Sequence, residues 1–158
     1  RRGPLLSEDL SLGRLLAARH LRLRAEVQRC LLDFALSQGL GEALGVHVRR
    51  TDKRKEAPSN LALTPREAAG AVLRRAQELG AARAFLASDD AAFLGDLRAL
   101  LEASGLPCVS WGSRLPERPG RACHMDKCIP GLEKAVDALA DCFLLAQCQG
   151  LLCSYSSL

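Results

Sequence analysis

The stretch that decides the fold of this chain is Gly45–Lys53, which reads Gly-Val-His-Val-Arg-Arg-Thr-Asp-Lys. Together with Leu44, its first half alternates apolar residues as a buried strand does. The second half places paired arginines directly after that strand. Guanidinium groups bind phosphate oxygens two at a time, so a rigid strand that ends in arginines is suited to hold a phosphorylated ligand. A solvated run of cations is the alternative interpretation.

The composition is that of a globular domain. The chain has 158 residues, of which 48% are hydrophobic and 25% are charged, and this length fits one domain with a real core. The net charge of +4 is modest, and aromatic residues make up only 4%. A nucleic-acid binder usually has more charge and more aromatic residues for base stacking, so the composition argues against that class.

The periodicity predicts an alternation of helices and strands. Thr64 is followed by Pro65 and Glu67, which is the pattern of a capping box at a helix start. We expect helices over residues 21–36, 65–79, 91–103 and 131–147, and strands over 44–48, 84–87, 107–110 and 150–153. Strands that alternate with helices form βαβ units, so the predicted fold class is α/β, a parallel sheet with flanking helices.

The domain organisation is predicted to be simple. Residues 1–20 show no clear period, and we interpret them as a residual upstream segment. Residues 21–158 form the single predicted domain. The chain begins without Met and stops just after an apolar strand. We therefore expect a fragment of a longer protein whose domain is incomplete at its C-terminus.

Polar residues follow three of the four predicted strands. They lie at residues 49–52, 88–90 and 154–157. Ligands of open parallel sheets bind beyond the carboxyl ends of the strands. Polar groups that meet at this edge are what a nucleotide site requires, and this is the functional inference that depends on no resemblance.

The arginines and the acids of these loops have two interpretations each. If the strand continues, Arg49 and Arg50 point to opposite faces, so one enters the cleft while the other pairs with an acid such as Asp52 or Asp89. One carboxylate of the Asp89–Asp90 pair is expected to cap the following helix. The other remains available to bind a ribose or Arg50.

His47 and the serines near the C-terminus are further candidates. His47 lies between two valines; it is either a hydrogen-bonded core histidine or a ligand contact two residues before Arg49. Ser154, Ser156 and Ser157 follow the last strand. They either form an ordinary turn or begin a helix whose N–H groups face a phosphate.

No metal is predicted. The segment Cys123–Cys128 contains possible ligands, but its spacing matches no strong zinc pattern and a second Cys/His pair is absent. The seven cysteines leave the redox compartment open. Neither a Gly-x-Gly-x-x-Gly sequence nor a P-loop occurs, so the glycine-rich phosphate loops are excluded.

Three segments of the chain resemble one enzyme family. Residues 47–53 resemble the signature of the α1,6-fucosyltransferase family, which includes the animal core-fucosylating enzymes and the rhizobial nodulation fucosyltransferases. Residues 85–90 resemble the family's strand that ends in paired aspartates. Residues 141–146 and 151–157 resemble its last helix and its serine-bearing strand. The resemblance covers roughly residues 21–157, the donor-binding half of such an enzyme.

The resemblance implies a fold and an activity. The expected fold is the Rossmann-like donor-binding lobe of a GT-B-like enzyme, truncated and without most of its acceptor lobe. The expected activity is inverting transfer of fucose from GDP-fucose to a glycan or glycoprotein acceptor, with no metal or other cofactor. The implied location is the Golgi lumen, as a type II membrane protein, for a eukaryotic chain and the cytoplasm for a bacterial one.

The resemblance also assigns roles to single residues. Arg49 is implied to hold the β-phosphate of GDP, and His47 and Asp141 to contact the guanine. Ser156 and Ser157 are implied to meet the phosphates.

The remaining implied site residues order the site or take part in catalysis. Asp52 and the pair Asp89–Asp90 are expected to order the donor site, to which Arg50 also belongs. Lys53 is implied to lie near the acceptor and to act with Arg49 in catalysis. Glu56 is the candidate base, although the corresponding acid of the animal enzymes stands one position later. The glutamine that follows the paired serines in the family is Leu158 here.

Three rival functions remain open from the sequence. The first is a glycosyltransferase that uses another nucleotide sugar on the same scaffold. The second is a non-catalytic nucleotide- or glycan-binding module. The third is a nucleic-acid binder that uses the cations of residues 49–55, which the low aromatic content disfavours.

Overall fold

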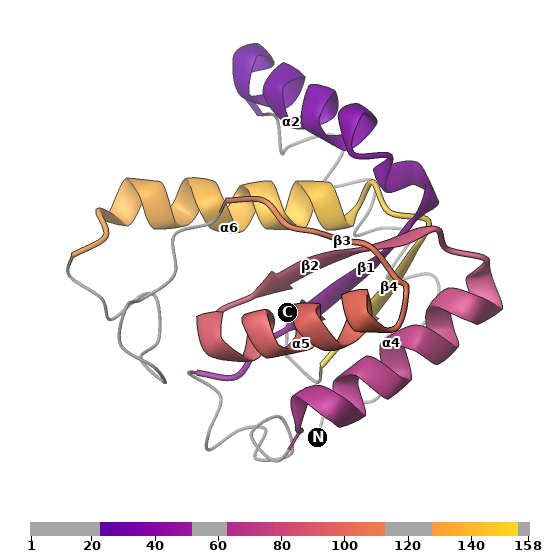
Figure 1. Cartoon of the computed structure of the whole chain (residues 1–158). Coiled ribbons are helices and arrows are strands. Elements are labelled where there is room, and N and C mark those ends of the chain that lie inside the picture. The colour runs from indigo at the N-terminus through magenta and orange to yellow at the C-terminus, as the bar shows by residue number, and fades with distance from the viewer. Residues whose placement is uncertain (1–22, 52–62, 113–127, 155–158) are drawn as a thin grey trace, which may run out of the picture.

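A computed structural model describes residues 23–51, 63–112 and 128–154 as a parallel sheet with helices on both faces (Figure 1). This confirms the predicted α/β class with a parallel sheet and flanking helices. In chain order the elements are α2 (Ala25–Ser37), the 3-10 turn η1 (Leu40–Glu42), β1 (Ala43–Val48), α4 (Pro65–Leu79), β2 (Arg83–Ser88), α5 (Ala91–Ala103), β3 (Cys108–Val109), α6 (Gly131–Leu145) and β4 (Gly150–Cys153).

The boundaries follow the sequence pattern closely, with small differences at the ends. Strand β3 covers only two of the four residues predicted at 107–110, and α6 ends at Leu145 rather than at residue 147. Helix α2 begins at Ala25, four residues later than predicted. The predicted upstream segment, residues 1–20, lies outside the described residues. None of the described helices is long and apolar enough to cross a membrane.

Capping explains where α4 begins and ends. The Thr64 hydroxyl accepts a hydrogen bond from the Glu67 N–H, and the Glu67 carboxylate accepts one from the Thr64 N–H. These two bonds are the predicted capping box. Gly80 ends the helix at φ 64°, a left-handed conformation that glycine adopts without steric cost.

The four strands of the described sheet are parallel, in the order β3-β2-β1-β4. In β1 every residue except His47 is buried, and in β2 only Arg83 is not. Central strands of a parallel sheet are covered on both faces, which is why these two strands are almost continuously apolar.

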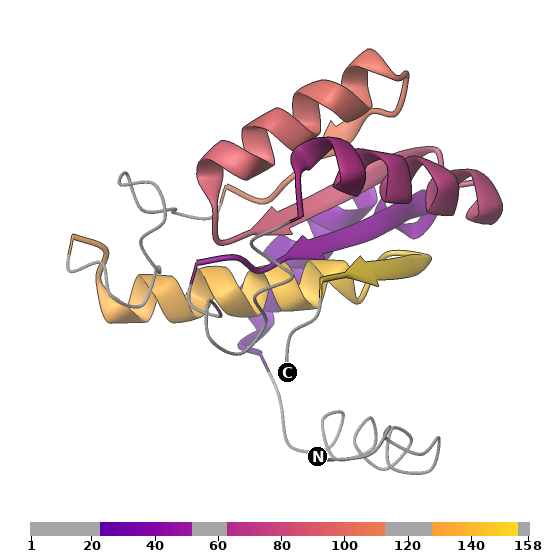
Figure 2. The same ribbon diagram turned by 90° about the horizontal axis from the view of Figure 1, so that it is seen from below.

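Each face of the sheet has its own core. The core under α4 and α5 includes Val46, Val48 and Leu86, whereas the core under α2 and α6 includes Ala43 and Phe85. Figure 2 shows the same arrangement from below, with α4 and α5 on one side of the strands and α6 on the other. Because side chains alternate along a strand, Val46 and Val48 on the α4 face place His47 on the α6 face.

The strand order has a reversal next to β1. The chain passes from β1 to β2 and β3 in one direction, and then returns past both to place β4 on the other side of β1. Right-handed crossovers put helices on opposite faces when the direction changes, which accounts for α4 and α5 on one face and α6 on the other. The carboxyl ends of β1 and β4 therefore flank a topological switch point, the usual ligand position in open α/β sheets.

Candidate functional site

The candidate site lies where β1, β2 and β4 end. Residues 49–51 follow β1, Asp89 and Asp90 follow β2, and Ser154 follows β4. Hydrogen bonds join all three strand ends, as described below, so the predicted gathering of polar residues at one edge is confirmed for the described part of the chain.

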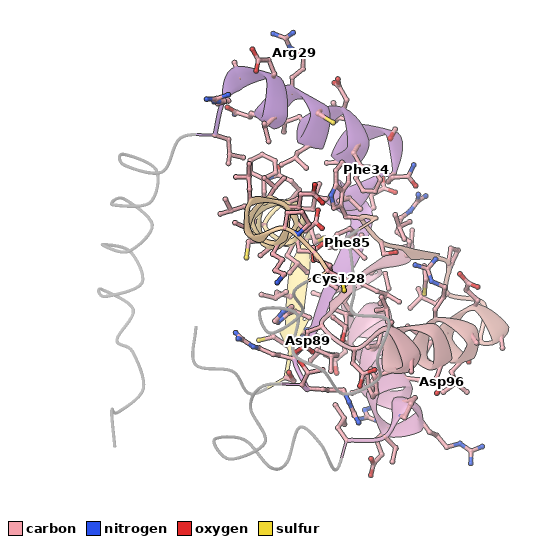
Figure 3. All side chains as sticks on the ribbon, turned by 90° about the vertical axis from the view of Figure 1, so that its left-hand side faces the viewer. Arg29, Phe34, Phe85, Asp89, Asp96 and Cys128 are labelled. Carbon is pink, nitrogen blue, oxygen red and sulfur yellow. The ribbon has the colours of Figure 1, made fainter. Side chains whose placement is uncertain are left out.

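Asp89 fixes the path of the chain after β1. One carboxylate oxygen accepts a hydrogen bond from the Arg50 N–H at 2.8 Å. The other accepts two from Thr51, one from its N–H at 3.0 Å and one from its hydroxyl at 2.6 Å. The Thr51 side chain is consequently buried. Figure 3 shows Asp89 at the end of the strands remote from α2. Asp89 thus orders the loop, and the donors that its carboxylate binds are two main-chain N–H groups and one hydroxyl.

Ser154 holds the same loop from the other side. Its N–H donates to the His47 carbonyl at 2.9 Å, and its hydroxyl accepts a hydrogen bond from the Arg49 N–H at 3.0 Å. The consecutive N–H groups of Arg49, Arg50 and Thr51 therefore all bond to side chains from neighbouring strands. An anion at this edge must be met by side chains rather than by these N–H groups.

The Arg50 guanidinium is built into the protein. Its Nε lies 3.2 Å from an oxygen of Asp90, in a pair whose side chains are 16% and 17% exposed. Its Nη1 donates to the Leu63 carbonyl, and its guanidinium carbon lies 4.4 Å from the centre of the Phe93 ring. The sequence predicted that one arginine pairs with an acid. Asp90 pairs with the Arg50 side chain, whereas Asp89 accepts the Arg50 main-chain N–H; Asp52 lies outside the described residues.

Asp90 is also the cap of α5. Its second oxygen accepts the Phe93 N–H at 3.1 Å, and its own N–H donates to the Ser88 hydroxyl at 3.2 Å. One acid of the pair was predicted to cap this helix, and Asp90 confirms it. The remaining acid, Asp89, is engaged by the loop after β1, so the contacts of both carboxylates favour an ordering role over direct ligand contact.

Arg49 is the half-buried cation next to the switch point. Its main chain follows β1 directly and is joined to Ser154 after β4. Arg49 therefore lies at the strand end beside β4, where ligands of open α/β sheets bind.

Burial favours the neutral form of His47. Burial lowers the pKa of His47 below its ordinary value of 6.5; the nearby Asp89 opposes this decrease, and Arg49 adds to it. A neutral imidazole has one donor nitrogen and one acceptor nitrogen, so it can contact a polar ring edge without adding charge.

Asp141, which the resemblance assigns to the guanine together with His47, lies on α6. A Cβ placed on Gly45 would lie 3.1 Å from the Leu145 side chain, so α6 crosses β1 at that level. Asp141 is one turn before Leu145 on the same side of α6, about 6 Å along its axis. His47 is two residues beyond Gly45 on the same face of β1, about 7 Å along the strand. Asp141 therefore lies on the helix that covers the face of β1 to which His47 belongs.

The structure adds two residues that the sequence analysis missed. Asp137 is buried one turn before Asp141, and it shares the sheet-facing side of α6 with Ala140 and Leu144. The i, i+3, i+7 spacing of these three residues is the signal that could have identified it. Phe93, which stacks on Arg50, is the other, and its place three residues after Asp90 in a capped helix was the available signal.

Five of the predicted site residues lie outside the described residues, namely Asp52, Lys53, Glu56, Ser156 and Ser157. The candidate zinc segment is outside as well, except for Cys128. Within the ranges that the structure covers, no group of three or more His, Cys, Asp or Glu side chains is arranged to hold a metal ion. Burial raises the pKa of the Cys108 and Cys148 thiols to about 11, so both remain protonated near neutral pH.

Comparison of the chain with models of known protein families gives no match, and comparison with curated proteins gives none either.

Proposed function

We propose that this protein binds GDP-fucose in the crevice between β1 and β4 and transfers the fucose to a glycan acceptor with inversion and without a metal. The observation that carries the proposal is the position of Arg49 at the topological switch point, directly after β1 and joined through its main chain to Ser154 after β4. The resemblance of residues 47–53 to the fucosyltransferase signature supports GDP-fucose as the donor.

Arg49 is proposed to bind the β-phosphate. In an inverting displacement the acceptor oxygen forms a bond to the anomeric carbon of fucose while the bond from that carbon to the phosphate oxygen breaks. The electron pair of the breaking bond remains on GDP. A fixed guanidinium stabilises the transition state, in which this charge develops, more strongly than it stabilises the bound substrate. This difference is what lowers the barrier.

His47 and Asp141 are proposed to recognise the guanine. In support of this, α6, which carries Asp141, covers the face of β1 to which His47 belongs. Guanine presents N–H donors along one edge, and a carboxylate accepts two such donors side by side. Adenine lacks this pair of donors, so an acid at this position favours guanine.

The other proposed roles fall outside the described residues. Ser156 and Ser157 are proposed to meet the phosphates, and Lys53 to lie near the acceptor. Asp52 is proposed to order the site. Glu56 is proposed to take the proton of the attacking hydroxyl. An acceptor lobe that completes a GT-B-like enzyme, and a Golgi location in a eukaryotic host, belong to the same proposal.

Comparison of ligands by thermal shift tests the donor. GDP is expected to raise the melting temperature more than UDP or ADP at equal concentration, because only GDP carries both the diphosphate and the guanine. Equal shifts from all three would reject the guanine site. Turnover of GDP-fucose then tests the chemistry. Glu56→Gln should leave GDP binding unchanged while it removes transfer, and the absence of transfer in the wild type as well would leave a binding module.

A further inference from the structure

Ser154 has a place in the fold that its position in the sequence does not reveal. It follows β4 and spans the switch point to reach the first residue after β1, 105 positions earlier in the chain. Its main chain extends the β1–β4 ladder by one bond, from its N–H to the His47 carbonyl. Its hydroxyl makes a separate contact, accepting the Arg49 N–H at 3.0 Å.

The two sides of the switch point hold different parts of the loop after β1. Asp89, on the β2 side, accepts the N–H groups of Arg50 and Thr51. Ser154, on the β4 side, accepts the N–H of Arg49. The backbone of Arg49 is therefore held by the residue that follows β4, on the other side of the switch point.

We propose that Ser154 is a positioning residue that fixes the Arg49 guanidinium for the terminal phosphate of the ligand. This inference rests on the proposed function, in which Arg49 binds the β-phosphate. The guanidinium is at the end of a long side chain, so a small rotation of the backbone moves it appreciably. A misplacement of about 1 Å in a site of this kind can cost about 100-fold in rate.

A merely structural role for the hydroxyl makes a different prediction. If the Ser154 hydroxyl only secured the end of β4, its loss would weaken every ligand of the crevice alike. If it positions Arg49, its loss weakens only the ligands that carry the group which Arg49 binds. GDP and GMP differ by the β-phosphate, so the ratio of their dissociation constants separates the two roles.

The experiment compares Ser154→Ala with Ser154→Thr, which retains a hydroxyl. Ser37→Ala is the matched control, because that residue also loses a hydroxyl hydrogen bond to a main-chain group, at the end of α2. Ser154→Ala is expected to weaken GDP binding about 5-fold, the effect of one hydrogen bond of about 1 kcal/mol. It is expected to leave GMP binding unchanged. Ser154→Thr should restore the GDP preference, and Ser37→Ala should not alter it.

Hydrogen exchange of the Arg49 amide provides a readout that needs no ligand. Protection of this amide should fall in Ser154→Ala and recover in Ser154→Thr. Unchanged protection, or an equal loss of GDP and GMP affinity, would overturn the proposal for Ser154. Failure of the wild-type protein to prefer GDP over GMP would instead reject the proposed function, and the amide exchange would then decide whether Ser154 holds the Arg49 backbone.

Discussion

At the residue scale, the neighbouring residues Arg49 and Arg50 have different surroundings. Arg50 is compensated by Asp90 and stacked on Phe93, whereas Arg49 follows the central strand at the switch point. The difference arises because their partners come from different strands. Removal of the Arg50 guanidinium leaves the largely buried Asp90 carboxylate without its charged partner, which is unfavourable.

The arginine pair therefore predicts opposite mutational effects. Arg49→Ala should abolish measurable GDP binding while the protein stays folded. Arg50→Ala should lower the free energy of unfolding by about 1–3 kcal/mol, because Asp90 loses its charged partner. Calorimetry and urea denaturation of both variants check this. Retained GDP affinity in Arg49→Ala would contradict the assignment of the phosphate contact.

His47 predicts a pH dependence. The pKa of His47 is below 6.5 in the folded protein, so below pH 6.5 the unfolded chain binds more protons at this residue than the folded protein does. The folded state therefore loses stability as the pH falls from about 6.5 through the folded-state pKa. Urea denaturation at a series of pH values should show a shallower acid loss for His47→Gln than for the wild type. Identical slopes would show that His47 is not the group responsible.

At the element scale, the strands and helices are joined by side chains that bridge one strand end to the next. Asp89 accepts three hydrogen bonds from the segment after β1, and Asp90 caps α5 while it pairs with Arg50. The loop and α5 are thus ordered by adjacent acids. On the opposite face of the sheet, β1 packs closely at Gly45 against the side chains of Leu145 and Cys148.

Loss of the Asp89 carboxylate should disorder the loop after β1. Asp89→Ala is expected to lower the free energy of unfolding by about 2–4 kcal/mol, because two main-chain N–H groups and a buried hydroxyl lose their acceptor. Asp96→Ala is the matched control, since this exposed acid lies on α5 (Figure 3). Urea denaturation of both variants measures the difference, and equal stabilities would contradict the ordering role of Asp89.

The packing of α6 on β1 predicts a cost for any side chain at Gly45. A Cβ there would lie 3.3 Å from the Cys148 Cβ, which cannot move without its backbone. Gly45→Ala should therefore lower the free energy of unfolding by about 1–3 kcal/mol. Gly41→Ala, where a Cβ meets nothing within 4 Å, is the control and should be nearly neutral. A stabilised Gly45→Ala variant would show that α6 packs less closely than described.

Local sequence signals predicted where helices and strands begin and end, but they did not predict which side chains would contact one another across the sheet. Thr64, Glu67 and Gly80 identify the ends of α4 because capping depends on residues within a turn of each other. The partners of Arg49 and Arg50 could not be predicted in this way. They lie 105 and 40 residues away, and their proximity depends on the strand order, which the hydrophobic pattern does not encode.

At the scale of the whole molecule, one topological feature accounts for the site. The strand order reverses after β3, so that β4 lies beside β1, and the carboxyl ends of these two strands flank the usual ligand position of open α/β sheets. The face of β1 that α6 covers carries His47, and α6 carries Asp141. A phosphate-binding group at the strand ends and a base-recognising pair on one face are the two halves of the proposed nucleotide site.

The most direct test of this account is a calorimetric titration of GDP into the wild-type protein, with GMP and UDP as controls, each with and without EDTA. We predict that GDP binds more tightly than GMP, because Arg49 holds the β-phosphate, and more tightly than UDP, because Asp141 and His47 select guanine. EDTA should change neither preference. Binding that does not distinguish GDP from both controls, or that EDTA abolishes, would contradict a metal-independent GDP site between β1 and β4.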